Sequence, residues 1–125
     1  MTQIFLLTAA ILGGLSVAGG AFASHALQER LAERALEIFE TGARYQMYHA
    51  LALLVVALLL SRAEAAQSLL TAAGFAFITG VVLFCGSLYG LSLSGIKILG
   101  AVAPLGGAAF LIGWGCLAVA ALNYK

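Results

Sequence analysis

Charged and titratable residues are concentrated in one short segment of this 125-residue chain, and almost everything outside it is apolar. Between Ser24 and His49 lie both histidines, four of the five acidic residues and three of the four arginines. Only 9% of the chain is charged and 63% is hydrophobic, whereas soluble domains contain about 25% charged residues. A soluble core of this size cannot bury so much apolar surface. The sequence therefore predicts a membrane protein with the lipid bilayer as its main partner.

Four apolar stretches are each long enough to cross a bilayer as a helix, which takes about 20 residues for roughly 30 Å of hydrocarbon. Because backbone polar groups cannot stay unpaired in lipid, we expect helices. The second stretch is the shortest, and Arg44 at its start can extend to the headgroups. The predicted fold is an all-α four-transmembrane-helix bundle in a single domain, 1–125, with spans at about 4–24, 43–61, 69–91 and 98–122.

A separate amphipathic helix is predicted over about 26–41, between the first two spans. Apolar residues recur there at helical spacing, and the charged residues occupy the opposite side. Such a helix is expected to lie at the membrane interface, either as a cover for the rim of the bundle or as a docking helix for a partner. Its acidic residues outnumber its arginines, so attraction to anionic lipid is not its main feature.

The first span also resembles the apolar core of a signal peptide, and Ala21-Phe22-Ala23 resembles a cleavage site. The residues before this span include no lysine or arginine. We therefore expect the segment to be retained as a transmembrane helix.

Small residues are predicted to mediate helix packing, because helices in lipid associate through close backbone approach. Ala10, Gly14 and Ala18 form one stripe on the first span, and Ser16, Gly20 and Ser24 form another. Pro104 is the only proline and predicts a bend beside Gly100, whose freed carbonyl needs a partner, either the Ser92–Ser94 turn or a water. The predicted packing residues are Gly14, Gly20, Gly86, Gly90, Pro104 and Gly107.

Polar residues of all four spans are expected at one end of the bundle, where span one ends, span two begins, span three ends and span four begins. Arg44 can bind a lipid phosphate, or it can pair with Glu40 one helical turn earlier. Tyr45 and Tyr48 also suit the aromatic belt at headgroup level. The candidate site for a ligand or partner consists of His25, Arg44, Tyr45, Tyr48, His49, Ser87 and Tyr89.

His49 lies about five residues further into the membrane than Arg44, and ionisable groups at such depth usually face the bundle interior. One interpretation is a neutral imidazole bonded to Tyr89, Ser87 or a backbone carbonyl. A pH-sensitive or ligand-binding histidine is a second interpretation. A metal or haem held by His25 and His49 is a third, but two histidines alone are a weak signal.

No catalytic set, metal site or cofactor is predicted from the remaining residues. Cys85 and Cys116 both lie deep in apolar runs and are interpreted as small buried hydrophobes. A net charge of +1 argues against nucleic-acid binding, which needs a basic face. A lipid-modifying enzyme is a further alternative, based on Ser24 beside His25 and Ser87 near His49. It is disfavoured because neither pair has an evident orienting carboxylate.

The orientation follows from basic residues in short loops, which favour the cytoplasmic side. With both termini outside, the cytoplasmic side holds Arg30, Arg34, Arg44 and Lys97, while Arg62 and Lys125 lie outside. The margin is four to two, so we expect both termini outside the inner or plasma membrane.

Segments 20–27 (GAFASHAL) and 44–51 (RYQMYHAL) resemble characteristic segments of the domain of unknown function 423 family, which includes transmembrane protein 256 of animals. Segments 86–89 (GSLY) and 104–107 (PLGG) are also similar to that family, so the resemblance covers nearly the whole chain. Ala23-Ser24 departs from it, since many members show glycine-alanine there. The resemblance implies a small multi-span membrane protein, supports four helices and a retained first span, and brings no established activity.

Two functions are compatible with these features. The first is a non-enzymatic structural or accessory component of a membrane complex, or a homo-oligomer, which uses the abundant small-residue faces. The second is a small transporter or channel with a polar site at one membrane face. None of the four spans contains an acidic residue, which argues against export coupled to protons through a carboxylate.

Overall fold

The computed structural model describes residues 1–125 and contains four long helical rods and no strand. Each rod is long and apolar enough to cross a membrane, which confirms the predicted all-α bundle with four spans. Two of the rods contain one π-helical turn each, a local widening of the α-helix. The rods are α1 (Thr2–Phe22) with η1 (Ala23–Leu27), α2 (Glu33–Arg62), α3 (Gln67–Gly80) with η2 (Val81–Cys85) and α4 (Gly86–Ser94), and α5 (Leu99–Leu122).

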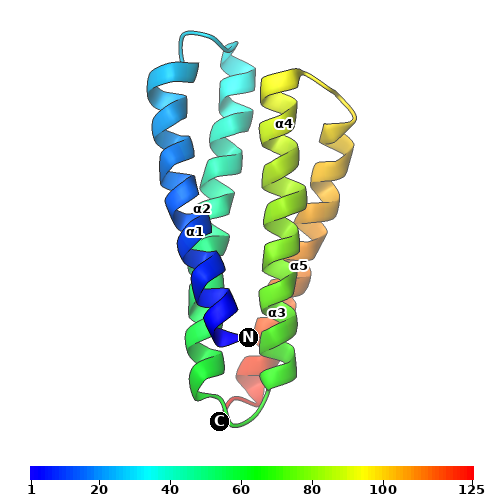
Figure 1. Cartoon of the computed structure of the whole chain (residues 1–125). Helices are drawn as coiled ribbons and strands as arrows, with labels where there is room; N and C mark the ends of the chain where they lie inside the picture. Colours follow the sequence, from blue (N-terminus) through cyan, green and yellow to red (C-terminus); the bar gives the residue numbers. More distant parts are fainter.

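The rods run alternately up and down, as Figure 1 shows. Residues 28–32 and 95–98 connect them at one end, and residues 63–66 connect them at the other. Such short connections make consecutive helices antiparallel neighbours. Both chain termini lie at the end that holds the 63–66 connection (Figure 1). Gly95 ends α4 with a left-handed φ of 73°, and its N–H donates to the carbonyl of Leu91 at 2.8 Å.

The separate interfacial helix predicted over 26–41 is wrong. Residues 23–27 instead extend α1, and α2 begins at Glu33 and continues without interruption to Arg62. No proline separates the charged turns from the apolar ones, and Gly42 is tolerated within the helix because the ring of Tyr89 packs against it. The charged residues 33–40 are therefore the first turns of the second span. The expectation that no span contains an acidic residue is wrong for this helix, which includes Glu33, Glu37 and Glu40.

The apolar side of this segment packs on the bundle rather than on the membrane surface. Leu27 and Phe39 are buried with Ala23 in a small cluster at the end of the bundle. Leu31 and Leu36 pack against the same cluster. The amphipathic pattern was correct in period, but its apolar face is buried within the chain.

The main core is formed by aromatic rings that lie against glycines of neighbouring helices. Phe5 lies against Gly74, and Phe110 lies against Gly80, so closely that a methyl group on either glycine would overlap the ring. Phe77 occupies the space beside Gly113, where an added Cβ would lie 2.6 Å from the ring. Since lipid provides little hydrophobic force between helices, such close contacts supply the attraction. The side chains of Phe5 and Phe77 are completely buried, together with Leu53, Leu70, Val56 and Cys85.

Most glycines predicted to pack helices together do not do so within the chain. An added Cβ would meet nothing within 4 Å at Gly14, Gly20, Gly86 and Gly107. Gly90 is the exception and approaches Leu99. The prediction was that helices approach each other's backbones along stripes of small residues, whereas this bundle mostly packs large rings against its glycines. One backbone approach does occur, between Gly106 and Phe84, at the π-helical turn η2.

Pro104 lies inside α5, which continues through it from Leu99 to Leu122. The Ser92–Ser94 turn was expected to supply a partner for the freed carbonyl of Gly100, but its serine hydroxyls bond within α4 instead. Ser92 donates to the carbonyl of Tyr89 at 3.0 Å, and Ser94 donates to that of Gly90 at 2.5 Å. The expected partnership between this turn and Gly100 is therefore wrong.

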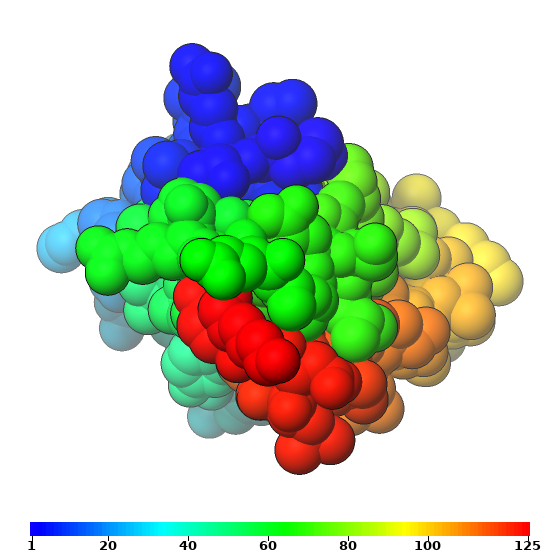
Figure 2. All heavy atoms as spheres, turned by 90° about the horizontal axis from the view of Figure 1, so that it is seen from below, coloured from blue at the N-terminus to red at the C-terminus, as the bar shows by residue number.

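The C-terminal residues close the opposite end of the bundle. Figure 2 views this end directly. The last residues (red) lie against the green segment that includes the 63–66 connection, and α1 (blue) lies on the other side of that segment. The N–H of Glu64 donates to the carbonyl of Lys125 at 2.6 Å. Many large apolar side chains elsewhere face outward, including Leu7, Leu15, Val82, Leu111 and Leu122. That surface suits contact with lipid.

Candidate functional site

One face of α2 carries Gln46 and His49, the two largest of the buried polar residues of the bundle. Its buried positions recur every three or four residues, as expected for one side of a helix. Polar side chains interrupt this face twice, at Gln46 and at His49, both about 5% exposed. The buried face of α2 comprises Phe39, Gly42, Ala43, Gln46, His49, Ala50, Ala52, Leu53, Val56 and Ala57.

Gln46 connects three helices. Its side-chain N–H donates to the carbonyl of Leu12 in α1 at 2.8 Å. Its side-chain oxygen accepts the hydroxyl of Tyr89 in α4 at 2.7 Å. The ring of Tyr89 lies against Phe39 and Gly42 on the same face of α2. A further bond joins α1 to α2, from the hydroxyl of Ser16 to the carbonyl of Ala43 at 2.5 Å.

His49 lies near the middle of α2 and contacts α5. Its imidazole stacks on the ring of Phe110, with ring centroids 3.6 Å apart and planes 9° from parallel. The indole N–H of Trp114 donates to its Nε2 at 3.1 Å. Its Nδ1 lies 2.8 Å from the carbonyl oxygen of Tyr45, one turn earlier. Both ring nitrogens therefore have partners.

These two contacts determine the tautomer of His49. An indole N–H can only donate, so Nε2 of His49 must accept and carries no proton. A carbonyl oxygen can only accept, so Nδ1 carries the proton and donates to Tyr45. His49 is thus neutral in this arrangement. A metal ion or another ligand at Nε2 would have to displace Trp114.

The structure separates the two histidines. His25 is exposed in η1, whereas His49 is buried in the interior of the bundle. Neither a hydrogen bond nor a ring contact joins them. Among the partners predicted for His49, the backbone carbonyl is confirmed, and Tyr89 bonds to Gln46 instead. Ser87 is buried in α4 and does not bond to His49.

Arg44, Tyr45 and Tyr48 occupy the outer side of α2. Tyr45 and Tyr48 are 38% and 51% exposed, and their rings lie 5.6 Å apart. Tyr45 also contacts Phe84, with ring centroids 5.0 Å apart. Arg44 is exposed. The structure therefore does not bring the seven predicted residues together as one site.

Two residues that make the buried polar contacts between helices, Gln46 and Trp114, were not predicted as site residues. Gln46 is spaced three residues from His49, which puts both on one helix face, and this spacing could have identified it. Trp114 is the only tryptophan of the chain, but no local pattern places it opposite His49. No group of three or more histidine, cysteine or acidic side chains is arranged to hold a metal ion.

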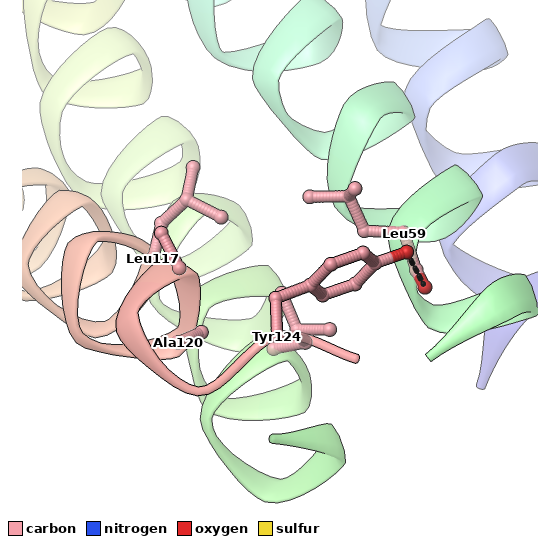
Figure 3. Close-up of a pocket in the computed structure, with 6 residues that line it drawn as sticks. Leu59, Leu117, Ala120 and Tyr124 are labelled. Atoms are coloured by element: carbon pink, nitrogen blue, oxygen red, sulfur yellow. Dashed lines mark hydrogen bonds between the residues drawn. The ribbon is translucent and has the colours of Figure 1, made fainter. Parts of the chain in front are cut away.

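Two hollows open on the surface. An apolar pocket of about 340 Å³ lies near the C-terminus, where the hydroxyl of Tyr124 donates to the carbonyl of Leu59 at 3.3 Å (Figure 3). Its lining carries no charged group. The second hollow, of about 420 Å³, is a polar groove between α1 and α2, lined by Ser16, Gly20, Ser24, Glu40, Ala43, Arg44 and Met47. We call it the α1–α2 groove.

The helices and their internal hydrogen bonds define a polytopic α-helical membrane protein whose buried Gln46 and His49 bond to other helices of the bundle. Comparison with known proteins specifies the family. The model described as "Protein of unknown function (DUF423)" matches residues 19–107, and the chain belongs to this family.

Three similar bacterial proteins are named as membrane proteins. The chain is 45% identical to the UPF0382 membrane protein YwdK of Bacillus subtilis, with 98% of each chain covered. It is 38% identical to a UPF0382 membrane protein of Staphylococcus epidermidis, again with 98% of each covered. A UPF0382 membrane protein of Staphylococcus aureus is 35% identical over the same shares. No solved structure matches the chain.

Proposed function

We propose that this protein is a non-enzymatic accessory or structural component of a membrane complex, and that α1 binds the transmembrane helix of a partner. The observation that supports this is the outward stripe of Ala10, Gly14 and Ala18. All three residues are exposed, and nothing lies within 4 Å of a Cβ added to Gly14. A partner helix can approach the backbone closely along such a stripe.

The internal polar residues support the same proposal. No buried side-chain nitrogen or oxygen lacks a hydrogen-bond partner. The groups that could bind a substrate inside the bundle, Gln46 and His49, are engaged with other helices of the chain. The interior is suited to holding α1, α2, α4 and α5 together, and the outer surface remains available for binding.

Site-specific cross-linking in native membranes tests the proposal. Cys85 and Cys116 would be replaced by alanine, and a single cysteine would be introduced by Gly14→Cys. We expect Gly14→Cys to cross-link to one protein of defined mass. The matched control Leu15→Cys, on an exposed large residue next to it, should not.

Binding of the partner should also depend on the Ala10–Gly14–Ala18 stripe itself. In mild detergent, the native assembly should be larger than a monomer or homodimer, and Gly14→Leu should release the partner while Leu15→Ala retains it. Migration as a monomer or homodimer under all conditions would contradict the proposal, as would a cross-link only to a second copy.

The transporter alternative depends on His49 being free to bind a proton or solute. That role would require breaking its bond to Trp114. Flux of protons or small cations in reconstituted vesicles that is lost in His49→Ala, but not in the exposed His25→Ala, would favour transport over the accessory role.

We also propose that both termini lie outside the bacterial cell membrane. The end that holds residues 28–32 and 95–98 carries four basic residues, and the opposite end carries two. An alkaline phosphatase fusion after Lys125 should be active, and the same enzyme inserted at Gly95 should be inactive. The reverse result would overturn this orientation.

A further inference from the structure

The α1–α2 groove contains two opposite charges that do not pair with each other. Glu40 and Arg44 are four residues apart on α2, in the order that favours an ion pair on a helix. The only ion pair within 4 Å in the chain joins Arg34 and Glu37 instead. Neither Glu40 nor Arg44 donates or accepts a side-chain hydrogen bond within the chain. Both charges are available to a ligand.

The groove has a defined direction relative to the membrane. Bonds from Ser16 to Ala43 and from Gln46 to Leu12 set the register of the two antiparallel helices. Glu40 and Ser24 therefore lie toward the end of the bundle, and Met47 lies toward its middle. At 1.5 Å per residue, Arg44 is about 6 Å further in than Glu40. The groove becomes less polar with depth.

This order matches the order of groups in one class of lipid. From the water inward, a phosphoethanolamine lipid presents a primary ammonium, then a phosphate, then acyl chains. In the order of their backbone positions along α2, the groove presents Glu40, then Arg44, then Met47. A guanidinium binds phosphate through two parallel N–H donors, and a carboxylate accepts N–H donors from an ammonium.

The hydroxyl groups of the groove add acceptors rather than donors. Ser24 donates its proton to the carbonyl of Gly20 at 3.1 Å, and Ser16 donates to Ala43. The oxygen of Ser24, which lines the same groove as Glu40, can therefore accept from an ammonium. An anionic headgroup without an ammonium would face the unpaired carboxylate of Glu40, which disfavours it.

We propose that the α1–α2 groove binds a phospholipid with a phosphoethanolamine headgroup, with Arg44 on the phosphate and Glu40 on the ammonium. The Ala10–Gly14–Ala18 stripe lies about 200° around α1 from Ser16, since successive residues turn by 100°. The lipid and a partner helix can therefore bind at the same time, and each proposal can fail without the other.

Native mass spectrometry of the purified full chain tests this site. The protein in neutral detergent would receive equal amounts of phosphatidylethanolamine, phosphatidylcholine and phosphatidylglycerol with identical acyl chains. We expect the ethanolamine lipid to be retained in preference to the other two. Arg44→Gln should lower retention of the ethanolamine lipid about tenfold, which corresponds to about 1.4 kcal/mol.

Two further variants make the test specific. Glu40→Gln should reduce the ethanolamine lipid to the level of the choline lipid, because only the primary ammonium donates hydrogen bonds. Arg34→Gln removes a neighbouring, 82% exposed arginine that lies outside the groove, and it should leave retention unchanged. Circular dichroism and size-exclusion profiles would confirm that each variant is folded.

Three results would overturn the proposal. One is equal retention in Arg44→Gln and Arg34→Gln, and a second is a preference for phosphatidylglycerol in the unmodified protein. The third is an ethanolamine preference that survives Glu40→Gln.

Discussion

Arg44 and Gln46 are two residues apart on α2, yet they belong to regions with opposite properties. Gln46 is buried, and its amide is engaged by Leu12 and Tyr89 from two other helices. Arg44 is exposed in the α1–α2 groove and has no partner in the chain. Two residues turn a helix by about 200°, which moves a side chain from the interior to the surface. The interior of the bundle is thus closed, with Gln46 and His49 bonded to other helices, and the groove is open and charged.

This comparison shows where binding is to be sought in such a small membrane protein. Polar groups in a lipid-facing bundle must find partners, because no water is available at that depth. Groups at mid-depth therefore bind one another and stabilise the fold. Groups near headgroup level have polar surroundings and can stay free for ligands.

The largest effect is expected from crowding the interior at Gly106→Ala. The added methyl group would overlap the backbone of Phe84, which cannot rotate away as a side chain can. We expect a loss of about 1–3 kcal/mol of stability, the range for overpacked cores. Denaturant titration in bicelles would measure it. Gly107→Ala, the adjacent residue with open space around it, should change stability by less than about 0.5 kcal/mol. Equal effects at both positions would contradict the described packing.

The next largest effect is expected from Gln46→Leu, which removes two hydrogen bonds and leaves the Tyr89 hydroxyl without a partner. Interhelical hydrogen bonds in membranes average about 0.6 kcal/mol, with a maximum of about 1.7. We expect a loss of about 1–2 kcal/mol by the same titration. Gln3→Leu changes an exposed glutamine that makes no side-chain bond, and it should be neutral. An unchanged free energy of unfolding in Gln46→Leu would show that this residue does not stabilise the interior.

A smaller effect is expected from the contact between His49 and Trp114. Phenylalanine at position 49 keeps a ring against Phe110 but cannot accept the indole N–H. A double-mutant cycle with His49→Phe and Trp114→Phe should give a coupling energy of about 0.6 kcal/mol. Strict additivity of the two single changes would indicate that the bond contributes nothing to stability.

The smallest effect on stability is expected from Arg44→Gln in the groove. Its guanidinium has no partner in the chain, so its removal should change the free energy of unfolding by less than about 0.5 kcal/mol in detergent without added lipid. Thermal unfolding monitored by circular dichroism would measure this. A loss as large as that of Gln46→Leu would remove the distinction between the two regions.

Much of the fold was predictable from the sequence. The four spans follow from the lengths of the apolar stretches, and the expected antiparallel order follows from the short connections between them. The error at 26–41 arose because amphipathic spacing identifies a helix but does not show whether its apolar side meets lipid or protein. Here Leu27 and Phe39 meet protein.

The site was less predictable, because its contacts join residues far apart in the chain. His49 and Trp114 are separated by 65 positions, and Gln46 and Tyr89 by 43. Periodicity within α2 places Gln46 and His49 on one face, but it does not show which helix lies opposite. The packing glycines Gly74 and Gly80 were not predicted for a similar reason, since their partners Phe5 and Phe110 come from other helices.

The protonation of His49 tests the central claim most directly, namely that the interior polar groups are paired with one another. Long-range ¹H–¹⁵N correlation spectra of the ¹⁵N-labelled protein in bicelles would show which ring nitrogen carries the proton. There are only two histidines in the chain, and His25, exposed in η1, serves as an internal reference. We expect His49 to be locked with the proton on Nδ1 and His25 to exchange between tautomers. A proton on Nε2 of His49, or averaging like that of His25, would contradict the closed interior.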